Sequence, residues 1–313
     1  MKAAIVEHAG QVPIYGDFPS PVPTEGEVTI HVVAAALTPL TRGRAAGTHY
    51  TSGGSFPFIA GFDGVGRLDD GTRVFFVMPR APQGSMAEQV TVPNGQWLAL
   101  PDDVDDLTAA AIGNAGVSSW GALTERAKLQ TGETVLVNGA TGASGRLAVA
   151  IARHLGARRV IATGRNQAVL DTLGVDATIR LDGNEQAIQA AAAEHFGAGV
   201  DVVLDYLWGP SARALLLAAA AGRRGVPVRF TQIGSITGEE IALPAGILRS
   251  SRIELLGSGI GSLSLGQMMS AAGRMFTAAA GASLTLDYRA VALADVAEAW
   301  GKGERERIVF QTG

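Results

Sequence analysis

The stretch from Glu133 to Asn166, ETVLVNGATGASGRLAVAIARHLGARRVIATGRN, decides the fold of this chain. It opens with a short apolar run rich in β-branched residues, Thr134 to Val137, which is typical of a buried parallel strand. A turn of small residues, Asn138 to Gly145, follows, and leucine and isoleucine then recur at helical spacing until Gly156. A second apolar strand, Val160 to Thr163, comes next. The order strand, glycine turn, helix, strand predicts the first half of a dinucleotide-binding fold.

The composition of the turn has a physical reason. A phosphate sits on a helix N-terminus only where the backbone comes very close to it, and a Cβ atom in the wrong place blocks that approach. The turn reads Ala140-x-Gly142-x-x-Gly145, with Ala140 where the usual fingerprint begins with Gly. Gly142 is expected to let the backbone approach the pyrophosphate, Gly145 to let the helix pack on the strand, and the Ser144 hydroxyl to donate to a phosphate oxygen. The expected cofactor-binding residues here are Asn138, Ala140, Thr141, Gly142, Ala143, Ser144 and Gly145. The alternative is a glycine-rich turn without a ligand, which the flanking strand and helix make the weaker reading.

The end of the second strand indicates which nucleotide binds. NAD sites usually carry Asp or Glu about 20 residues past the glycines, to bind the ribose hydroxyls. This chain has Thr163, Gly164, Arg165 and Asn166 there, so a guanidinium stands where a carboxylate is usual. Arginine suits a 2′-phosphate because its planar fork donates paired, charge-assisted hydrogen bonds. We therefore expect all four residues to bind NADP(H), with NADPH as the cofactor. The alternative is that Arg165 is a solvated loop charge.

Composition excludes several classes of function. The chain has 313 residues, of which 47% are hydrophobic and 17% charged, so a sizeable core is expected. A net charge of -4 gives no basic footprint for nucleic acid. Cysteine is absent, which excludes disulfides, thiolate nucleophiles and cysteine-ligated zinc, and the five histidines show no HExxH spacing. No metal site is expected. The apolar runs are too short to cross a bilayer and the N-terminus resembles no signal peptide, so a cytoplasmic protein is expected.

Two domains are expected from the change of pattern along the chain. Residues 1–112 are expected to form a β-barrel-like domain, because many short strands follow one another closely. Residues 113–256 alternate strands with helices, which predicts a doubly wound parallel sheet and places the chain in the α/β class. The strands expected in the first domain are Lys2 to Val6, Glu27 to Ala36, Phe56 to Gly66, Thr72 to Val77, Ala87 to Val92, Thr285 to Tyr288 and Ile308 to Gln311. The helices expected along the chain are Thr108 to Ile112, Val117 to Ala127, Gln167 to Leu173, Glu185 to Phe196, Ser211 to Ala221 and Leu293 to Trp300. The later strands expected in the sheet are Ala177 to Arg180, Val200 to Asp205, Val228 to Gly234 and Ile253 to Leu256.

Five motifs together resemble a known family. Phe56 to Gly66 resembles a Pro-x-Ile-x-Gly-x-Asp-x-x-Gly segment, and Gly71 to Val74 a Gly-Asp-Arg-Val turn. Gln83 to Glu88 resembles a Gly-x-x-Ala-Glu strand entry, Gly113 to Trp120 a segment ending Gly-x-Thr-Ala, and Val135 to Gly145 the nucleotide turn. In this order and spacing the motifs resemble the zinc-independent medium-chain dehydrogenase/reductases, specifically the quinone oxidoreductase-like branch. The resemblance covers nearly the whole chain.

The resemblance implies a GroES-like β-barrel domain of residues 1–112, completed by the C-terminal tail of residues 257–313, with a Rossmann domain of residues 113–256 inserted. It also implies NADPH-dependent reduction of a small molecule, a quinone or an activated alkene, by hydride transfer without metal. We expect a homodimer that binds neither nucleic acid nor membrane. The alternatives are an enoyl thioester reductase, which would need a groove for a long acyl chain, and a non-catalytic NADPH-binding redox sensor.

Candidate residues at the reaction centre follow from the same comparison. The family often carries Asn-Pro-x-Asp after an early strand, and here Thr38 and Thr41 replace the two polar residues, so no unambiguous proton donor remains. Ser118 corresponds to a threonine that approaches the nicotinamide, or else is a helix-terminal hydroxyl. Tyr50 matches a tyrosine that related enoyl reductases place near the substrate, where a phenol can donate to a developing enolate. Its alternative is a partly buried loop aromatic. Asp63 is expected to be structural.

Two pairs of residues end parallel strands, where the crevice of such a sheet binds its ligand. Asp205 with Tyr206, and Gly234 with Ser235, are expected to border the nicotinamide on this ground. Trp208, close behind Asp205, is either a core residue or a wall of the site.

Overall fold

The structure is a computed structural model that describes residues 1–222, 225–301 and 307–312. The chain forms two compact units. Unit 1 comprises Met1–Asn114 and Met268–Gly313, and unit 2 comprises Ala115–Gln267. Within the described ranges, no helix combines the length and apolar character that a bilayer span requires.

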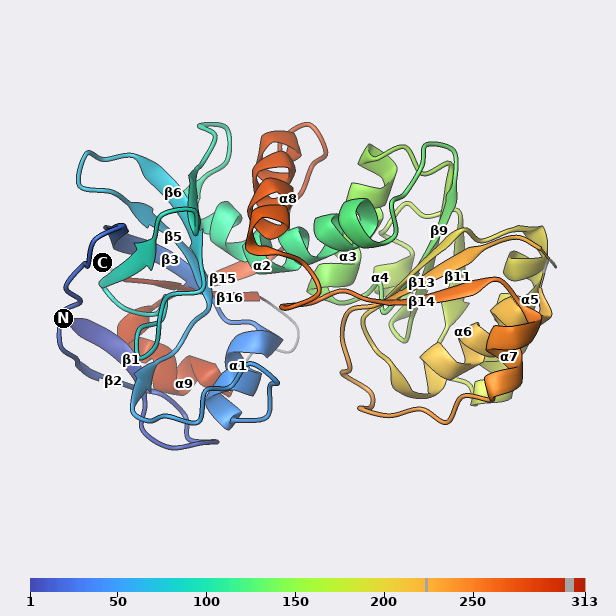
Figure 1. The fold of residues 1–313 in the computed structure, drawn as a ribbon, viewed down its shortest axis with the longest axis horizontal. Helices are drawn as coiled ribbons and strands as arrows, with labels where there is room; N and C mark the ends of the chain where they lie inside the picture. Colours follow the sequence, from blue (N-terminus) through green and yellow to red (C-terminus); the bar gives the residue numbers. More distant parts are fainter. Residues whose placement is uncertain (223–224, 302–306, 313) are drawn as a thin grey trace. The chain divides into compact units, whose positions relative to one another are not determined.

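Unit 1 is built from two sheets, largely antiparallel (Figure 1). The smaller sheet has the order β2-β1-β4, and the larger has the order β15-β16-β3-β5-β6-β8, with β7 also paired to β3. The strands are β1 Lys2–Val6, β2 Ile14–Asp17, β3 Glu27–Ala36, β4 Phe58–Ile59, β5 Asp63–Arg67, β6 Arg73–Val77, β7 Gln89–Pro93, β8 Trp97–Ala99, β15 Tyr288–Ala292 and β16 Arg307–Gln311. The C-terminal strand β16 pairs antiparallel with β3, so the C-terminal segment joins a sheet otherwise built largely from the first hundred residues.

Helices cover parts of these sheets. They are α1 Pro39–Ala46, α2 Asp106–Gly121, which runs on into unit 2, α8 Leu265–Ala278, the 3-10 turn η2 Leu293–Asp295 and α9 Val296–Trp300. The rings of Phe75 on β6 and Phe276 on α8 lie 4.9 Å apart, and both side chains are fully buried. Burial of two phenyl rings is a large hydrophobic contribution, so α8 is held on this sheet by its apolar face.

Two predicted strands of unit 1 are wrong. Phe56 to Gly66 is not one strand, because Gly61 has a φ of +104° and its missing Cβ would lie 2.8 Å from the Ser85 amide nitrogen. The backbone therefore turns there, β4 pairs with β1, and β5 pairs with β3 and β6. Thr285 to Tyr288 is also wrong: the strand is Tyr288–Ala292, where pairing with β16 fixes it.

Unit 2 contains a six-stranded parallel sheet in the order β11-β10-β9-β12-β13-β14. The strands are β9 Thr134–Asn138, β10 Arg159–Gly164, β11 Ala177–Arg180, β12 Val202–Asp205, β13 Val228–Gln232 and β14 Ile253–Gly257. The helices are α3 Ala143–His154, α4 Gln167–Leu170, α5 Glu185–Ala198, α6 Gly209–Ala221 and α7 Ala245–Ser250, with a π-helix, η1, at Ala122–Arg126. This order, with the chain running outward in both directions from β9, is that of a doubly wound sheet. The predicted α/β class is confirmed.

Helices lie on both faces of this sheet, and Figure 1 shows α3 on one side and α5, α6 and α7 on the other. Leu136 and Ile161 on the central strands pack against Phe196 of α5 and Leu215 and Leu216 of α6 in one buried cluster. Because both faces are covered, the middle positions of the central strands β9, β10 and β12 are apolar, as the sequence pattern predicted.

The expected break between two helices near Gly113 is wrong. Helix α2 runs without interruption from Asp106 to Gly121 and continues as the π-helix η1. A Cβ on Gly113 would lie 2.6 Å from a ring carbon of Phe75 and 3.1 Å from a carboxylate oxygen of Asp63. The glycine is therefore needed for close packing inside a helix and does not end one. Helix α4 is also shorter than expected and ends at Leu170 rather than Leu173.

Candidate functional site

The candidate site of unit 2 lies where the strand order reverses. Strands β9 and β12 are neighbours in the sheet, and their last residues, Asn138 and Asp205, are paired in register. The next helices, α3 and α6, leave to opposite faces of the sheet. Open α/β sheets bind ligands in the crevice that such a reversal leaves at the carboxyl ends of the strands.

The N-terminus of α3 presents free backbone donors at this edge. Its N-cap is Gly142, which has no side chain to accept from the first turn, and the first intrahelical bond is donated by Arg146 to the Gly142 carbonyl. The amides of Ala143, Ser144 and Gly145 consequently have no partner within the helix. Gly142 is exposed, and a Cβ there would meet only the Gly139 carbonyl oxygen, at 3.6 Å. The arrangement is an open cradle for an anionic group.

Gly145 serves a different purpose from Gly142. It is buried, and a Cβ at this position would lie 2.6 Å from the Ala140 Cα and closer still to the Gly139 carbonyl oxygen. Only a residue without a side chain allows the first turn of α3 to lie this close to the strand that precedes it. The packing role expected for Gly145 therefore has a direct steric cause.

Polar side chains from three strand ends form one buried network behind the turn. Asn138 Nδ2 donates to Asp205 Oδ1 at 2.7 Å and to Ser211 Oγ at 3.0 Å. The Thr163 hydroxyl donates to Asn138 Oδ1 at 2.7 Å and accepts from the Gly139 amide at 3.1 Å. Asn138, Thr163 and Asp205 are each fully buried. Their side chains, which the sequence placed at the cofactor, are occupied with one another and fix the backbone of the turn.

Asp205 also orders the start of α6. Its carboxylate accepts from the amides of Leu207 at 3.1 Å and Trp208 at 3.2 Å. Burial raises the pKa of Asp205 to about 6, although the hydrogen bonds from Asn138 and these two amides act to lower it. Trp208 has a φ of +57°, which is strained for a bulky residue. The hydrogen bond from its backbone amide to the Asp205 carboxylate helps to hold that conformation. Trp208 is partly buried and packs against the core of α5 and α6.

A second buried contact joins α2 to Tyr206, directly after the carboxyl end of β12. The sequence did not predict this contact. The Ser119 hydroxyl and the Tyr206 hydroxyl are 2.7 Å apart, and Ser119 Oγ also lies 2.8 Å from the Ala115 carbonyl and 3.1 Å from the Ser144 carbonyl. Both side chains are buried, and burial raises the pKa of the Tyr206 phenol, so it stays protonated. The neighbouring Ser118, the predicted nicotinamide contact, is partly exposed. No signal in the sequence separated the two adjacent serines.

The end of β10 carries the residues predicted to choose the nucleotide. Gly164 is buried, and a Cβ there would clash with the Thr141 side chain, so this glycine brings the strand end against the turn. Arg165 is exposed and forms no ion pair with any residue that the structure describes. Asn166 is exposed and caps α4, since its Oδ1 accepts from the Val169 amide at 3.3 Å. Thr141 is partly buried.

Gly234 and Ser235 follow β13, which ends at Gln232 and not at Gly234 as predicted. The Gly234 amide donates to the Asp205 carbonyl at 3.2 Å, which ties this loop to the end of β12. The Ser235 hydroxyl donates to Glu239 at 2.8 Å, so it has a partner within its own loop. Both residues are partly exposed.

Tyr50 lies in unit 1, on the loop after α1. Its side chain is 70% exposed and its ring stacks on His49 with a centroid distance of 4.3 Å. The Thr51 amide donates to His49 Nδ1 at 3.2 Å, so that nitrogen is the acceptor and Nε2 carries the proton of the neutral ring. Burial and the nearby charge of Arg44 lower the pKa of His49, which keeps it neutral at pH 7. The phenol of Tyr50 is thus accessible, and its neighbour is an uncharged imidazole.

Thr38 and Thr41 have a structural role. Thr38 is the N-cap of α1: its Oγ1 accepts from the Thr41 amide at 3.0 Å and lies 3.0 Å from the Thr41 hydroxyl. Both residues are buried, and Pro39 and Gly47 mark the two ends of the helix. The helix was not predicted, although Thr-Pro at its start and Gly at its end are its usual signals.

No cluster of zinc ligands is found among the residues that the structure describes. The sequence has no cysteine, and within the described residues no three His, Asp or Glu side chains come together as metal ligands would.

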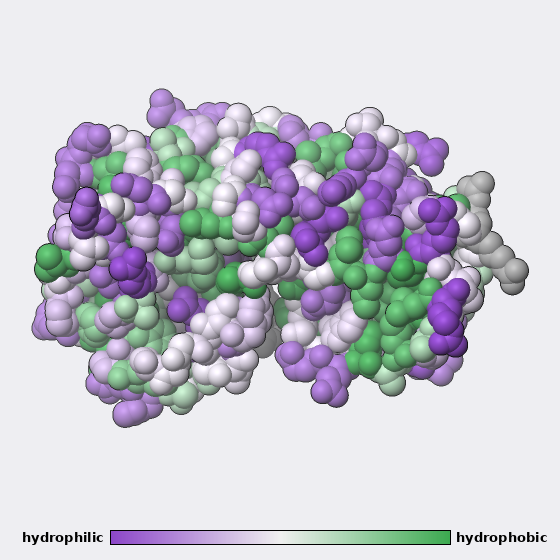
Figure 2. Space-filling view, in the orientation of Figure 1, coloured by the Kyte–Doolittle hydropathy of each residue, from purple (hydrophilic) through white to green (hydrophobic). Residues whose placement is uncertain are grey.

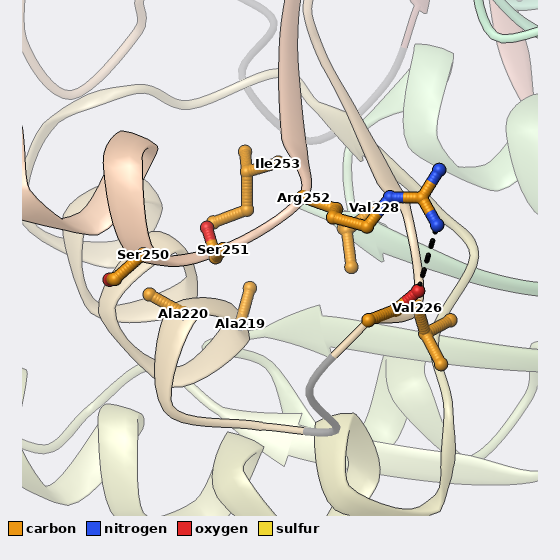
Figure 3. A pocket seen from close by; sticks show the side chains of 9 residues that line it. Ala219, Ala220, Val226, Val228, Ser250, Ser251, Arg252 and Ile253 are labelled. Carbon is orange, nitrogen blue, oxygen red and sulfur yellow. Dashed lines mark hydrogen bonds between the residues drawn. The ribbon is translucent and has the colours of Figure 1, made fainter.

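A small pocket lies at the amino ends of β13 and β14, away from the carboxyl ends where the candidate site lies (Figure 3). Its volume is about 10 Å³, and its lining includes Val228 and Ile253, which begin β13 and β14. Arg252 Nη1 donates to the Gly225 carbonyl at 3.0 Å beside it. A space of this size holds about one water molecule, so the pocket is no binding site for a nucleotide or a substrate.

Comparison with known proteins agrees with this geometry. Residues 143–278 match the family described as zinc-binding dehydrogenase. The chain is 32% identical over 309 residues to a probable NADPH-dependent quinone reductase, tdiC, of Emericella nidulans, covering 84% of this chain and 86% of that protein. It is 27% identical to the quinone oxidoreductase of Thermus thermophilus, which was solved alone and with NADPH. That likeness has a TM-score of 0.83 and covers 100% of both chains.

A third match concerns part of the chain. Over 181 residues it is 33% identical to a mycocerosic acid synthase-like polyketide synthase of Mycobacterium tuberculosis, covering 57% of this chain and 8% of that protein.

The strand order, the glycine turn and the similarity over most of the length of a probable quinone reductase agree with the resemblance drawn from the sequence. The chain belongs to the medium-chain dehydrogenase/reductase family, in its quinone oxidoreductase-like branch.

Proposed function

We propose that this protein is an NADPH-dependent oxidoreductase that transfers hydride to a quinone or an α,β-unsaturated carbonyl without a metal ion. The observation that carries the proposal is the end of β10, where an exposed Arg165 stands in place of the carboxylate of NAD sites. The names of its relatives support it, since one is a probable NADPH-dependent quinone reductase and another a quinone oxidoreductase solved with NADPH.

The residues of unit 2 suit NADPH. The free amides of Ala143, Ser144 and Gly145 can donate to the pyrophosphate, and the Ser144 hydroxyl adds one more donor. The open face of Gly142 leaves room for the phosphates to come against the backbone. Arg165 can donate two parallel hydrogen bonds to the 2′-phosphate. Ser118, Gly234 and Ser235 are proposed to border the nicotinamide.

The buried network contributes by fixing these donors before the nucleotide arrives. Hydrogen bonds among the side chains of Asn138, Thr163 and Asp205 fix the ends of β9, β10 and β12 relative to one another. Little reorganisation is therefore needed when the nucleotide binds. The bound nicotinamide supplies the hydride, and the protein has to orient it and exclude water. Unit 1, the proposed substrate domain, contributes Tyr50, whose exposed phenol can donate to the oxygen that gains charge as hydride adds.

Nucleotide choice is the direct test. Isothermal titration should show tighter binding of NADPH than of NADH. Arg165→Ala should weaken the binding free energy of NADPH by about 1.5–3 kcal/mol, the scale of a hydrogen bond to a charged group. The binding free energy of NADH should change little. Arg249→Ala is the matched control, since Arg249 is an exposed arginine of unit 2 on α7. Equal affinity for the two nucleotides would refute the proposal.

A second candidate is an enoyl thioester reductase. The observation that favours it is the similarity of about half of this chain to part of a polyketide synthase. Steady-state NADPH oxidation with quinones, simple enones and long-chain enoyl thioesters separates the two, because a thioester reductase should prefer the thioesters by a wide margin. NADPH binding without turnover of any of these substrates would favour a redox sensor.

We also propose a homodimer. Strand β14 is the edge of the parallel sheet, so one side of its backbone has no strand partner within the sheet. Leu255 on this strand and Leu248 on the preceding α7 are 42% and 43% exposed. Figure 2 shows apolar surface over the part of unit 2 that holds these elements. Light scattering should give twice the chain mass, and Leu255→Lys should lower it toward one chain.

A further inference from the structure

An arginine that the nucleotide motif does not include lies beside the predicted ribose-binding loop. Strands β10 and β11 are parallel neighbours, and Gly164 is in register with Arg180, the last residue of β11. The Leu181 amide donates to the Gly164 carbonyl at 3.0 Å. Adjacent strands lie about 4.8 Å apart, so the backbone of Arg180 is next to the residue that precedes Arg165.

The guanidinium of Arg180 reaches the same loop. Its Nη1 lies 3.4 Å from Gln167 Oε1, on the first residue of α4 and two residues after Arg165. Its Nη2 forms an ion pair with Asp182, and the two side chains are 43% and 54% exposed. The cation is therefore at the surface, at the end of the sheet where the 2′-phosphate is expected. It is held by a carboxylate two residues along the chain.

The chemistry of this pair is that of a replaceable counterion. A guanidinium has five N–H donors in a planar fork that fits carboxylate and phosphate alike. A phosphate monoester carries close to two negative charges near pH 7 and more acceptor oxygens than a carboxylate, so it is the stronger ligand. An exposed ion pair of this kind is weak because water and salt screen it, so a doubly charged phosphate can displace the carboxylate.

We propose that Arg180 is a second cationic ligand of the 2′-phosphate of NADPH, and that Asp182 is an internal competitor that holds the guanidinium until the phosphate binds. This specificity role rests on the proposed NADPH-dependent function. It makes NADPH preference a property of two arginines at the ends of neighbouring strands, one of them restrained by an acidic residue. Asp182 also disfavours the phosphate directly, because two like charges near one site repel each other.

Two substitutions with opposite expected effects test the proposal. Isothermal titration of the full chain is done with NADPH and with NADH, and 2′,5′-ADP is used as a competitor that carries the 2′-phosphate but no nicotinamide. Arg180→Gln should weaken NADPH and 2′,5′-ADP about five- to twentyfold and leave NADH unchanged. Asp182→Asn should tighten NADPH about two- to fivefold, since it frees the cation and removes the repulsion. A gain in affinity cannot come from damage to the fold.

The ion pair of Arg153 and Asp176 is the matched control. This pair is similarly exposed. Asp176 precedes β11, so the pair lies at the amino end of that strand, whereas Arg180 is at its carboxyl end. Asp176→Asn should leave NADPH affinity unchanged. The proposal is overturned if Asp182→Asn leaves NADPH affinity the same or weakens it, or if Arg180→Gln affects NADH as much as NADPH. Failure of the proposed function gives a different result, in which the unaltered protein shows no preference for NADPH over NADH.

Discussion

The two glycines of the α3 turn should respond differently to the same added methyl group: Gly145→Ala should lose stability, whereas Gly142→Ala should lose NADPH affinity with little loss of stability. In Gly145→Ala the new Cβ would lie 2.6 Å from the Ala140 Cα. Carbon atoms in good contact are about 3.5 Å apart, so the helix and the turn have to separate by about 1 Å. Both partners are backbone, which cannot rotate out of the way as a side chain would.

The expected loss of stability follows from this clash. Overpacking of this kind costs about 1–3 kcal/mol, and a rigid backbone partner places it at the upper end. Alanine regains up to about 1 kcal/mol of helix propensity over glycine. The net loss should be about 2 kcal/mol, or about 4–8 °C in Tm for a unit of this size. NADPH binding should also weaken, because the amides of the first turn move with the helix.

Gly142→Ala is the internal comparison. Gly142 has φ of -80° and ψ of 167°, a conformation that alanine adopts freely, and the added Cβ meets only the Gly139 oxygen at 3.6 Å. Stability should fall by about 0.5–1 kcal/mol, the scale of an N-cap change from Gly to Ala and well below the loss expected for Gly145→Ala. The methyl group, however, projects from the exposed backbone where the pyrophosphate is proposed to lie. NADPH affinity should fall at least about tenfold, or about 1.4 kcal/mol.

Urea unfolding followed by circular dichroism gives the stabilities, and isothermal titration with NADPH gives the affinities. The reasoning fails for Gly145 if its alanine variant unfolds at the same urea concentration as the unaltered protein. It fails for Gly142 if its alanine variant binds NADPH normally. Loss of both stability and affinity in both variants would mean that the turn tolerates no change, and the separation of roles would be wrong.

Three further predictions concern the proton, the pH and the metal. Tyr50→Phe should lower enone turnover about 10- to 100-fold and quinone turnover less, with NADPH affinity unchanged; unaltered enone turnover would leave solvent as the proton source. Burial raises the pKa of Asp63 to about 7, against the charge of Arg307, and its Oδ1 has no hydrogen-bond partner among the described residues. The folded protein therefore binds this proton more tightly than the unfolded chain. The free energy of unfolding should consequently fall as the pH rises from about 4 to about 7. Asp63→Asn should flatten part of that fall in urea titrations at pH 5 and pH 8, and an unchanged slope would contradict the assignment. EDTA should leave NADPH oxidation intact, and zinc-restored loss of turnover would count against metal independence.

The sequence alone determined the features that depend on near neighbours. Glu27–Ala36 was predicted with the bounds that the strand has, because alternation followed by an apolar run is a local pattern. The glycine turn was found because the strand, the turn and the helix are consecutive. The family followed from five local motifs, and the comparisons confirm it.

Long-range packing decided what the sequence missed. Strand β15 begins at Tyr288 because β16 pairs with it there, and no local signal marks that register. Gly113 read as a helix break, yet it is a contact point for Phe75 and Asp63, which are far away in the chain. Helix α1 is the exception, since its cap signals were present in the sequence.

The candidate site divides in the same way. The sequence identified Asn138 by its place in the glycine turn, and Thr163 and Asp205 by their places at strand ends. It predicted contact with the cofactor, which stays a prediction. The tertiary structure turns these side chains inward, where Asn138 bonds Asp205, 67 residues away, and Thr163, 25 residues away. Strand ends that are distant in sequence meet only when the sheet assembles. A polar side chain buried at such a junction is stable only with partners, so the fold, and not the motif, decides which polar residues stay free to meet a ligand.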